Sequence, residues 1–125
     1  MKDFIIKAGL VISGVIHLLP IAGVLGVKTI EKMYGVPVSD PNLEILLRHR
    51  AVLFGLLGSF LIFSAFKPML QGLAFPAGVL SVVSFIWIAY STGGYNPLIG
   101  RVVFADYVAL FCLIVGASFY FYRNV

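Results

Sequence analysis

Residues 70–90 read LQGLAFPAGVLSVVSFIWIAY and contain no charged side chain. An α-helix needs roughly 20 apolar residues to cross the hydrocarbon core of a bilayer, so this stretch predicts a transmembrane helix. Three other stretches are similarly apolar, and we expect four spans in all, at approximately residues 5–27, 43–66, 70–90 and 102–122. Short connections force neighbouring helices to run antiparallel. The predicted fold class is an all-α membrane protein, a four-transmembrane-helix up-down-up-down bundle in which residues 1–125 form a single membrane domain.

The composition supports the same conclusion. Of the 125 residues, 61% are hydrophobic and 11% are charged, whereas soluble domains are roughly half apolar and a quarter charged. A water-soluble fold of this size could not bury so much apolar surface, so the lipid bilayer is the expected partner. The net charge of +4 is spread along the chain without a basic tail, which fits lipid headgroup contact and excludes nucleic acid as a partner. Two assembly states stay open, a homo-oligomer and a subunit of a larger membrane complex.

Proline, glycine and aspartate mark the breaks in the first half of the chain. Pro20 lies inside the first span and should kink it, because it frees the carbonyl group four residues earlier. Residues 29–34 can form a short interfacial helix that Gly35 would end. Asp40 and Pro41 are typical of a helix start, the first as the cap and the second as the first helical residue.

Polar side chains are expected to gather at one end of the bundle. The loops at residues 28–40 and 91–101 lie on the same face of an antiparallel layout, so the polar residues beside them must meet there. His17 is near the bilayer midplane and should face the bundle and hydrogen-bond to a neighbouring helix, since polar groups in hydrocarbon seek partners. The predicted ligand-binding residues are Arg48, His49, Arg50, Asp106, His17, Glu44, Tyr95, Asn96 and Arg101.

Asp106 lies just over one helical turn inside the fourth predicted span, roughly 6 Å below its start. A charge in hydrocarbon costs several kcal/mol unless it faces protein, water or a partner. We therefore expect Asp106 to turn inward and pair with Arg48 or Arg50. Glu44 and Arg48 are four residues apart, in the order that favours an ion pair on one helix.

Each of these features also has a purely structural interpretation. Arg48-His49-Arg50 can form an interfacial collar that binds lipid phosphates, and successive helical residues point about 100° apart, so the three cannot face one way. Asp106 can serve only as an ion-pair partner, and His17 only as a hydrogen-bonded interior histidine. Residues 93–97 are typical of a turn, and Cys112 is typical of a packed interior.

The sequence contains no motif typical of an enzyme or of a bound cofactor. A P-loop, a Gly-rich dinucleotide fingerprint, GxSxG and HExxH are all absent. The single cysteine permits no disulfide within the chain. We therefore predict no catalytic residue, no metal site and no cofactor.

Positive charges are distributed almost evenly between the two membrane faces. The side of the termini has Lys2, Lys7, Lys67 and Arg123, and the other side has Lys28, Lys32, Arg48, Arg50 and Arg101. If both Arg48 and Arg50 point into the bundle, only three cations remain on the second side. The positive-inside rule then places both termini in the cytoplasm.

Three features set the layout of the chain: a glycine-rich first helix, the Tyr34-Gly35 pair, and the sequence LLRHRA at residues 46–51. Over nearly the whole chain this layout resembles the small four-helix bacterial membrane proteins that include the DoxX-like proteins. The resemblance implies a multi-pass protein of the bacterial inner membrane with an accessory or quinone-adjacent role in a respiratory or thiol-redox complex. The chain lacks the additional cysteines that a thiol-redox role would use.

Three functional hypotheses follow. The first is a non-catalytic membrane protein with a polar pocket that binds a lipid, a quinone-like molecule or a partner subunit, as an accessory subunit of a membrane complex. The second is a small proton-coupled transporter that acts as a dimer, with His17 as the mid-depth ionisable group. The third is a membrane enzyme acting on a lipid or isoprenoid, for which histidine, aspartate and arginine would supply a base and an anion clamp.

Overall fold

The structure, a computed structural model, describes residues 1–124, and every regular element in that part of the chain is a helix. The elements are α1 (Lys2–Leu18), the 3-10 helix η1 (Leu19–Leu25), α2 (Val27–Tyr34), α3 (Pro41–Ala65), α4 (Pro68–Thr92) and α5 (Pro97–Arg123). Four helical segments are long and apolar enough to cross a membrane: α1 joined to η1, α3, α4 and α5. The predicted all-α fold class is confirmed, and the chain is compatible with a multi-pass membrane protein.

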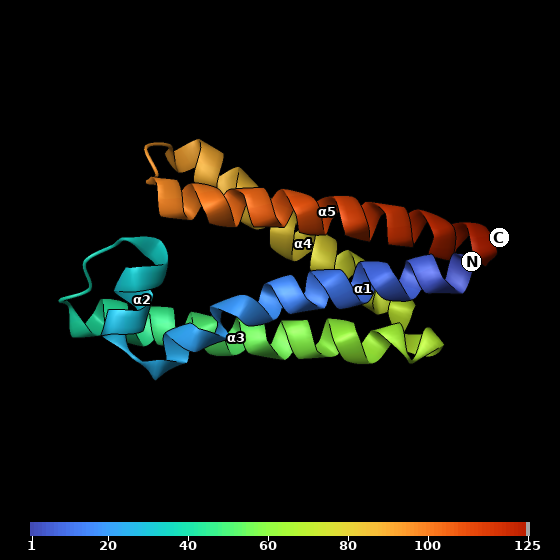
Figure 1. Ribbon diagram of the computed structural model, residues 1–125, viewed down its shortest axis with the longest axis horizontal. Helices are drawn as coiled ribbons and strands as arrows, with labels where there is room; N and C mark the ends of the chain where they lie inside the picture. The colour runs from blue at the N-terminus through green and yellow to red at the C-terminus, as the bar shows by residue number, and fades with distance from the viewer. Residues whose placement is uncertain (125) are drawn as a thin grey trace.

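The four long helices lie along the longest axis of the molecule, and successive ones run in opposite directions (Figure 1). Both termini are at one end, and α2 and the connection between α4 and α5 are at the other end. The helix α1 packs against α3 and α5, and α4 packs against the same two helices from the opposite side. The end of the bundle that contains α2 is the one where we expected polar side chains to meet.

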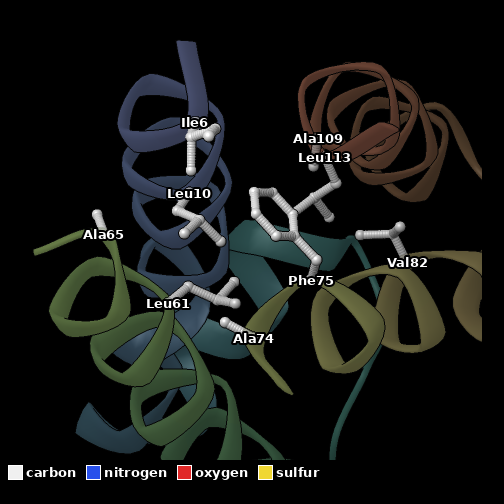
Figure 2. Packing of buried hydrophobic residues seen from close by; sticks show 9 residues of the cluster. All are labelled: Ile6, Leu10, Leu61, Ala65, Ala74, Phe75, Val82, Ala109 and Leu113. Carbon is white, nitrogen blue, oxygen red and sulfur yellow. The ribbon is translucent and has the colours of Figure 1, made fainter. Parts of the chain in front are cut away.

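The hydrophobic core lies where all four long helices converge. Figure 2 shows Phe75 reaching from α4 into the space between α1 and α5, where it meets Leu10 and Leu113. The other members of this cluster are Ile6, Leu61, Ala65, Ala74, Val82 and Ala109. This cluster lies toward the half of the bundle that holds the termini, and a second, smaller cluster of Ile30, Tyr34 and Val38 packs in the opposite half.

Two glycine contacts bring α1 close to its neighbours. A Cβ atom at Gly9 would lie 2.7 Å from the carbonyl oxygen of Cys112 on α5, and one at Gly58 would lie 2.7 Å from the carbonyl oxygen of Gly14. Neither distance leaves room for a side chain. Such close backbone approaches are a common way for helices to pack inside a membrane, where the hydrophobic effect does not drive association.

The first span changes helix type at Pro20. The α-helix ends at Leu18, and the chain continues as the 3-10 helix η1 with Pro20 in its first turn. A proline nitrogen cannot donate to the carbonyl group one turn earlier, which ends the regular α-helical pattern. The kink predicted from the sequence is thus a transition to a tighter helix.

The short helix predicted at residues 29–34 is present as α2. It ends at Gly35, whose φ of 65° is the left-handed conformation that glycine adopts most easily. After a short connection, the Asp40 side chain accepts a hydrogen bond from the backbone N–H of Asn42 at 2.9 Å, and Pro41 is the first residue of α3. Both helix-start predictions are confirmed.

The fourth span begins earlier than the sequence suggested. We expected it from residue 102, but α5 starts at Pro97 because the Asn96 side chain caps it, accepting from the N–H of Ile99 at 2.8 Å. The predicted loop at residues 91–101 is therefore mostly helical. Asp106 is nine residues after the first residue of α5, or ~14 Å along its axis from that end.

Candidate functional site

A cavity of about 500 Å³ opens inside the half of the bundle that contains α2. Five elements contribute to it, namely α1, η1, α2, α3 and α5. Its apolar lining residues are Ile16, Leu19, Pro20, Ala22, Met33, Phe54, Leu98, Val102 and Ala105. Its polar and charged lining residues are His17, Lys32, Tyr34, Arg50, Arg101 and Asp106. Apolar walls with a few convergent polar groups are typical of small-molecule sites.

Arg50 is fixed in this cavity by three aromatic rings. The guanidinium carbon lies 4.5 Å from the centre of the Phe54 ring, 5.5 Å from that of Tyr34 and 5.6 Å from that of Phe85. One terminal nitrogen donates a hydrogen bond to the Tyr34 hydroxyl at 3.1 Å. Cation–π contacts of this kind hold the charge without using its N–H donors, so the geometry of Arg50 is set by its surroundings while most of its donors stay free.

His17 is 3% exposed and hydrogen-bonded on both ring nitrogens. Its Nδ1 lies 2.7 Å from the Ser13 carbonyl oxygen, and its Nε2 lies 3.0 Å from the Ser81 hydroxyl on α4. Because a carbonyl oxygen can only accept, Nδ1 carries the hydrogen, and Nε2 of the neutral ring accepts from Ser81. The prediction that His17 faces the bundle and bonds to a neighbouring helix is confirmed.

Asp106 lines the cavity but forms no ion pair with an arginine. Among residues 1–124 the ion pairs are Glu44–Arg48 and Asp3–Arg123. The expected pairing of Asp106 with Arg48 or Arg50 is therefore wrong. Arg50 turns its guanidinium toward the aromatic rings instead, and Arg48 points away from the cavity.

Two charged side chains of the cavity, those of Arg50 and Asp106, lie at a similar depth. Arg50 is nine residues after Pro41, and Asp106 is nine residues after Pro97, so each lies ~14 Å from the same end of the bundle. Ser81, which binds His17, is eleven residues before the end of α4, or ~17 Å from that end. Three long helices thus bring polar side chains to a similar depth well inside the bundle.

The sequence LRHR at residues 47–50 places only its last arginine in the cavity. Arg48 pairs with Glu44 at 3.1 Å and donates from Nε to the Val24 carbonyl oxygen at 3.1 Å. His49 is exposed. Successive residues of a helix diverge by about 100°, which is why these neighbours separate into a pocket-lining residue and two outward ones.

Two further predicted site residues hold the end of the bundle together and do not line the cavity. Asn96 donates through its amide nitrogen to the carbonyl oxygen of Tyr34 at 2.7 Å, which ties α2 to α5. Tyr95 packs beside Tyr90, with ring centres 6.5 Å apart. Of the nine predicted residues, the cavity brings together His17, Arg50, Arg101 and Asp106.

Several residues around Arg50 were not anticipated from the sequence. Tyr34, Phe54 and Phe85 surround Arg50, although they come from three different helices. Phe54 is four residues after Arg50, so a cation–π pair on one helix face could have been predicted. Nothing in the sequence indicated that Tyr34 and Phe85 would join them.

A polar network is also present at the opposite end of the molecule. Arg123 pairs with Asp3 and donates to the Gln71 side-chain oxygen at 3.2 Å. Gln71 is 1% exposed and donates in turn to the Ala65 carbonyl oxygen at 3.2 Å. This network joins the two ends of the chain to α4.

No protein-family model, curated protein or solved structure matches this chain. The geometry of the cavity is therefore the main ground on which a function can be argued.

Proposed function

We propose that this chain is a non-catalytic membrane protein that binds a small amphipathic molecule, lipid-like or quinone-like, in the cavity between its helices. The observation that carries the proposal is the convergence of His17, Arg50 and Asp106, from three helices, on one otherwise apolar cavity of about 500 Å³. That volume falls in the usual range for ligand pockets. The polar groups would hold the head of the molecule and the apolar walls its body.

Because Asp106 forms no ion pair in the described part of the chain, it is better explained as a group that faces a ligand than as part of a structural ion pair. Burying charges inside a membrane protein costs several kcal/mol, and a purely structural layer offsets this cost by pairing them. Arg50 and Asp106 line the same cavity, yet within residues 1–124 they form no ion pair with each other. Charges that face a cavity without pairing are available to a bound molecule.

We propose further that the protein is an accessory subunit of a bacterial inner-membrane complex, of the DoxX-like kind. The support comes from the architecture: helices, among them four segments long and apolar enough to cross a membrane, occupy most of the 124 described residues. Little of that part of the chain lies in loops that could form a separate domain outside the bilayer. Apart from Arg50, which lies ~14 Å inside the bundle, four cations are near each end, Lys2, Lys7, Lys67 and Arg123 against Lys28, Lys32, Arg48 and Arg101. The positive charges therefore favour neither orientation, and labelling of single cysteines placed at the termini decides it.

The test is whether filling the cavity removes a bound molecule. Ala105 lines the cavity, so Ala105→Phe should occupy it, whereas Val108→Phe places the same phenylalanine side chain at an exposed site about one turn later on α5. Native mass spectrometry of the purified full chain should find a co-purified small molecule in the wild type and in Val108→Phe but not in Ala105→Phe. The same adducts on all three proteins would disprove a ligand in this cavity.

The depth of Asp106 also favours a second candidate, a proton-coupled carrier acting as a dimer. Asp106 lies ~14 Å from the first residue of α5, well inside the bundle. A carrier of this type needs a membrane-embedded ionisable group that binds substrate and proton in turn. If a pH gradient drives no uptake of the co-purified molecule into liposomes, this candidate is removed and the binding protein remains.

A further inference from the structure

Arg50 has more hydrogen-bond donors than the protein uses. A guanidinium group has five N–H donors, and the hydrogen bond to the Tyr34 hydroxyl is the one that Arg50 forms within residues 1–124. In that part of the chain every fully buried side-chain nitrogen or oxygen has a partner, so the unused nitrogens of Arg50 are accessible. Since Arg50 lines the cavity, this is where the unused donors can meet a ligand.

Tyr34 adds a further donor at the same place. Its hydroxyl oxygen accepts from Arg50, which leaves the hydroxyl hydrogen without a partner among the described residues. Tyr34 is 8% exposed and lines the cavity. Arg50 and Tyr34 therefore present a cluster of N–H and O–H donors that have no acceptor among the described residues.

The formal charges of the cavity do not balance. Lys32, Arg50 and Arg101 contribute three positive charges and Asp106 contributes one negative charge, so the excess is two. None of these four residues takes part in an ion pair within residues 1–124. Lys32 and Arg101 are exposed, at the mouth of the cavity, and Arg50 is half-buried. Three cations that converge on one cavity with a single carboxylate attract a bound anion.

The cations are also arranged by depth. Arg101 is four residues after the start of α5, ~6 Å along the helix, while Arg50 is ~14 Å from the start of α3. Lys32 is on α2, at the same end of the bundle as Arg101. A negatively charged head would thus meet Lys32 and Arg101 first and Arg50 deeper in the cavity.

We propose that the cavity selects amphiphiles with an oxyanion head, a carboxylate or a phosphate ester. Arg50 binds the oxyanion through paired N–H donors, a geometry for which a planar guanidinium is well suited. Tyr34 donates a further hydrogen bond, and the apolar walls near Met33 and Ala105 hold the alkyl part. This inference rests on the proposed function, because it specifies the head of the molecule that the cavity binds.

The experiment uses the full chain in phosphatidylcholine nanodiscs and two photoactivatable probes, a diazirine-bearing palmitic acid and its methyl ester. The two probes share one alkyl chain and differ in the charge of the head. Labelled residues are mapped by mass spectrometry, and we expect the acid to label the cavity walls about tenfold or more above the ester, as hydrogen bonds to a charged group imply. Both probes should label the lipid-facing surface equally.

Variants at Arg50 and Arg48 test which arginine selects the acid probe over the ester. Arg50→Gln should remove the preference for the acid, and Arg50→Lys, which keeps the charge without the paired donors, should lower it. Arg48→Gln should leave the preference intact, because Arg48 is engaged with Glu44 outside the cavity. Competition by oleate and by phosphatidylglycerol distinguishes a free fatty acid from an anionic phospholipid as the source of the oxyanion.

The outcomes separate this inference from the proposed function. Equal labelling of the cavity by acid and ester would overturn the oxyanion head while leaving an amphiphile-binding cavity. Labelling confined to the lipid-facing surface for both probes would overturn both. A preference for the acid that persists in folded Arg50→Gln and Arg50→Lys would reject Arg50 as the binding group.

Discussion

Arg50 on α3 donates a hydrogen bond of 3.1 Å to the hydroxyl of Tyr34 on α2. This bond joins a transmembrane helix to the short helix that lies over the cavity. Arg50 is also in contact with the face of the same tyrosine ring, at 5.5 Å from its centre. The position of the cation that defines the site therefore depends on a residue sixteen positions earlier in the chain.

Tyr34→Phe should keep the ring contact and remove the hydrogen bond. We expect the free energy of unfolding to fall by about 1 kcal/mol, since the bond involves a charged donor but is only partly buried. Thermal unfolding in detergent measures the change. Tyr122→Phe is the control, because Tyr122 is 70% exposed and its hydroxyl forms no hydrogen bond within residues 1–124; equal losses in the two variants would contradict the prediction.

Asn96 performs two separable tasks, and two substitutions distinguish them. Asn96→Asp keeps the oxygen that caps α5 but removes the amide donor to Tyr34, while Asn96→Ala removes both. Loss of a helix cap costs about 1 kcal/mol. Hydrogen exchange should become faster in α2 for both variants and faster at the start of α5 for Asn96→Ala alone. If the amides of α2 exchange at the wild-type rate in Asn96→Asp, the hydrogen bond from Asn96 to the Tyr34 carbonyl oxygen does not stabilise α2.

Gly9→Ala should force α1 and α5 apart. Its Cβ atom would lie 2.7 Å from the Cys112 carbonyl oxygen, a backbone atom that cannot rotate away. Overpacking of this kind costs about 1–3 kcal/mol, measurable by thermal unfolding in detergent. Gly100→Ala is the matched control, since its Cβ atom would be 3.8 Å from the nearest atom, in the Tyr95 ring; it should be neutral or stabilising by up to about 1 kcal/mol. A stable Gly9→Ala protein would show that the two helices can separate at little cost.

Asp106→Asn should strengthen binding of the fatty-acid probe. Asp106 supplies the negative charge among the cavity residues, so its removal raises the excess positive charge that attracts an anion. We expect affinity to rise roughly fivefold, equivalent to about 1 kcal/mol, as measured by competition of photolabelling with oleate.

Asp40→Asn is the control for this change. It removes the same charge at the same end of the bundle but outside the cavity, and asparagine caps a helix as well as aspartate does. We expect it to leave affinity unchanged. Weaker binding by Asp106→Asn would indicate that Asp106 itself contacts the head of the ligand.

The predicted site was partly recoverable from the sequence because helical periodicity and topology both constrain it. Asp106 and Arg50 had to lie at one end of the bundle once the spans were assigned, and His17 had to face inward because lipid disfavours a polar ring. The sequence did not show whether Arg48 or Arg50 would line the cavity. That choice depended on the rotation of α3 about its axis, which its packing against α1 and α4 sets.

The sequence by itself predicted the four apolar helical segments, the cap at Asp40 and the end of α2 at Gly35, because these follow from local hydropathy and backbone chemistry. The tertiary structure alone decided that Arg50 is held among aromatic rings and that Asp106 stays unpaired beside it. Those relationships join residues from different helices. They are set by helix rotation, by the close contact at Gly9, and by the cap at Asn96 that starts α5 at Pro97.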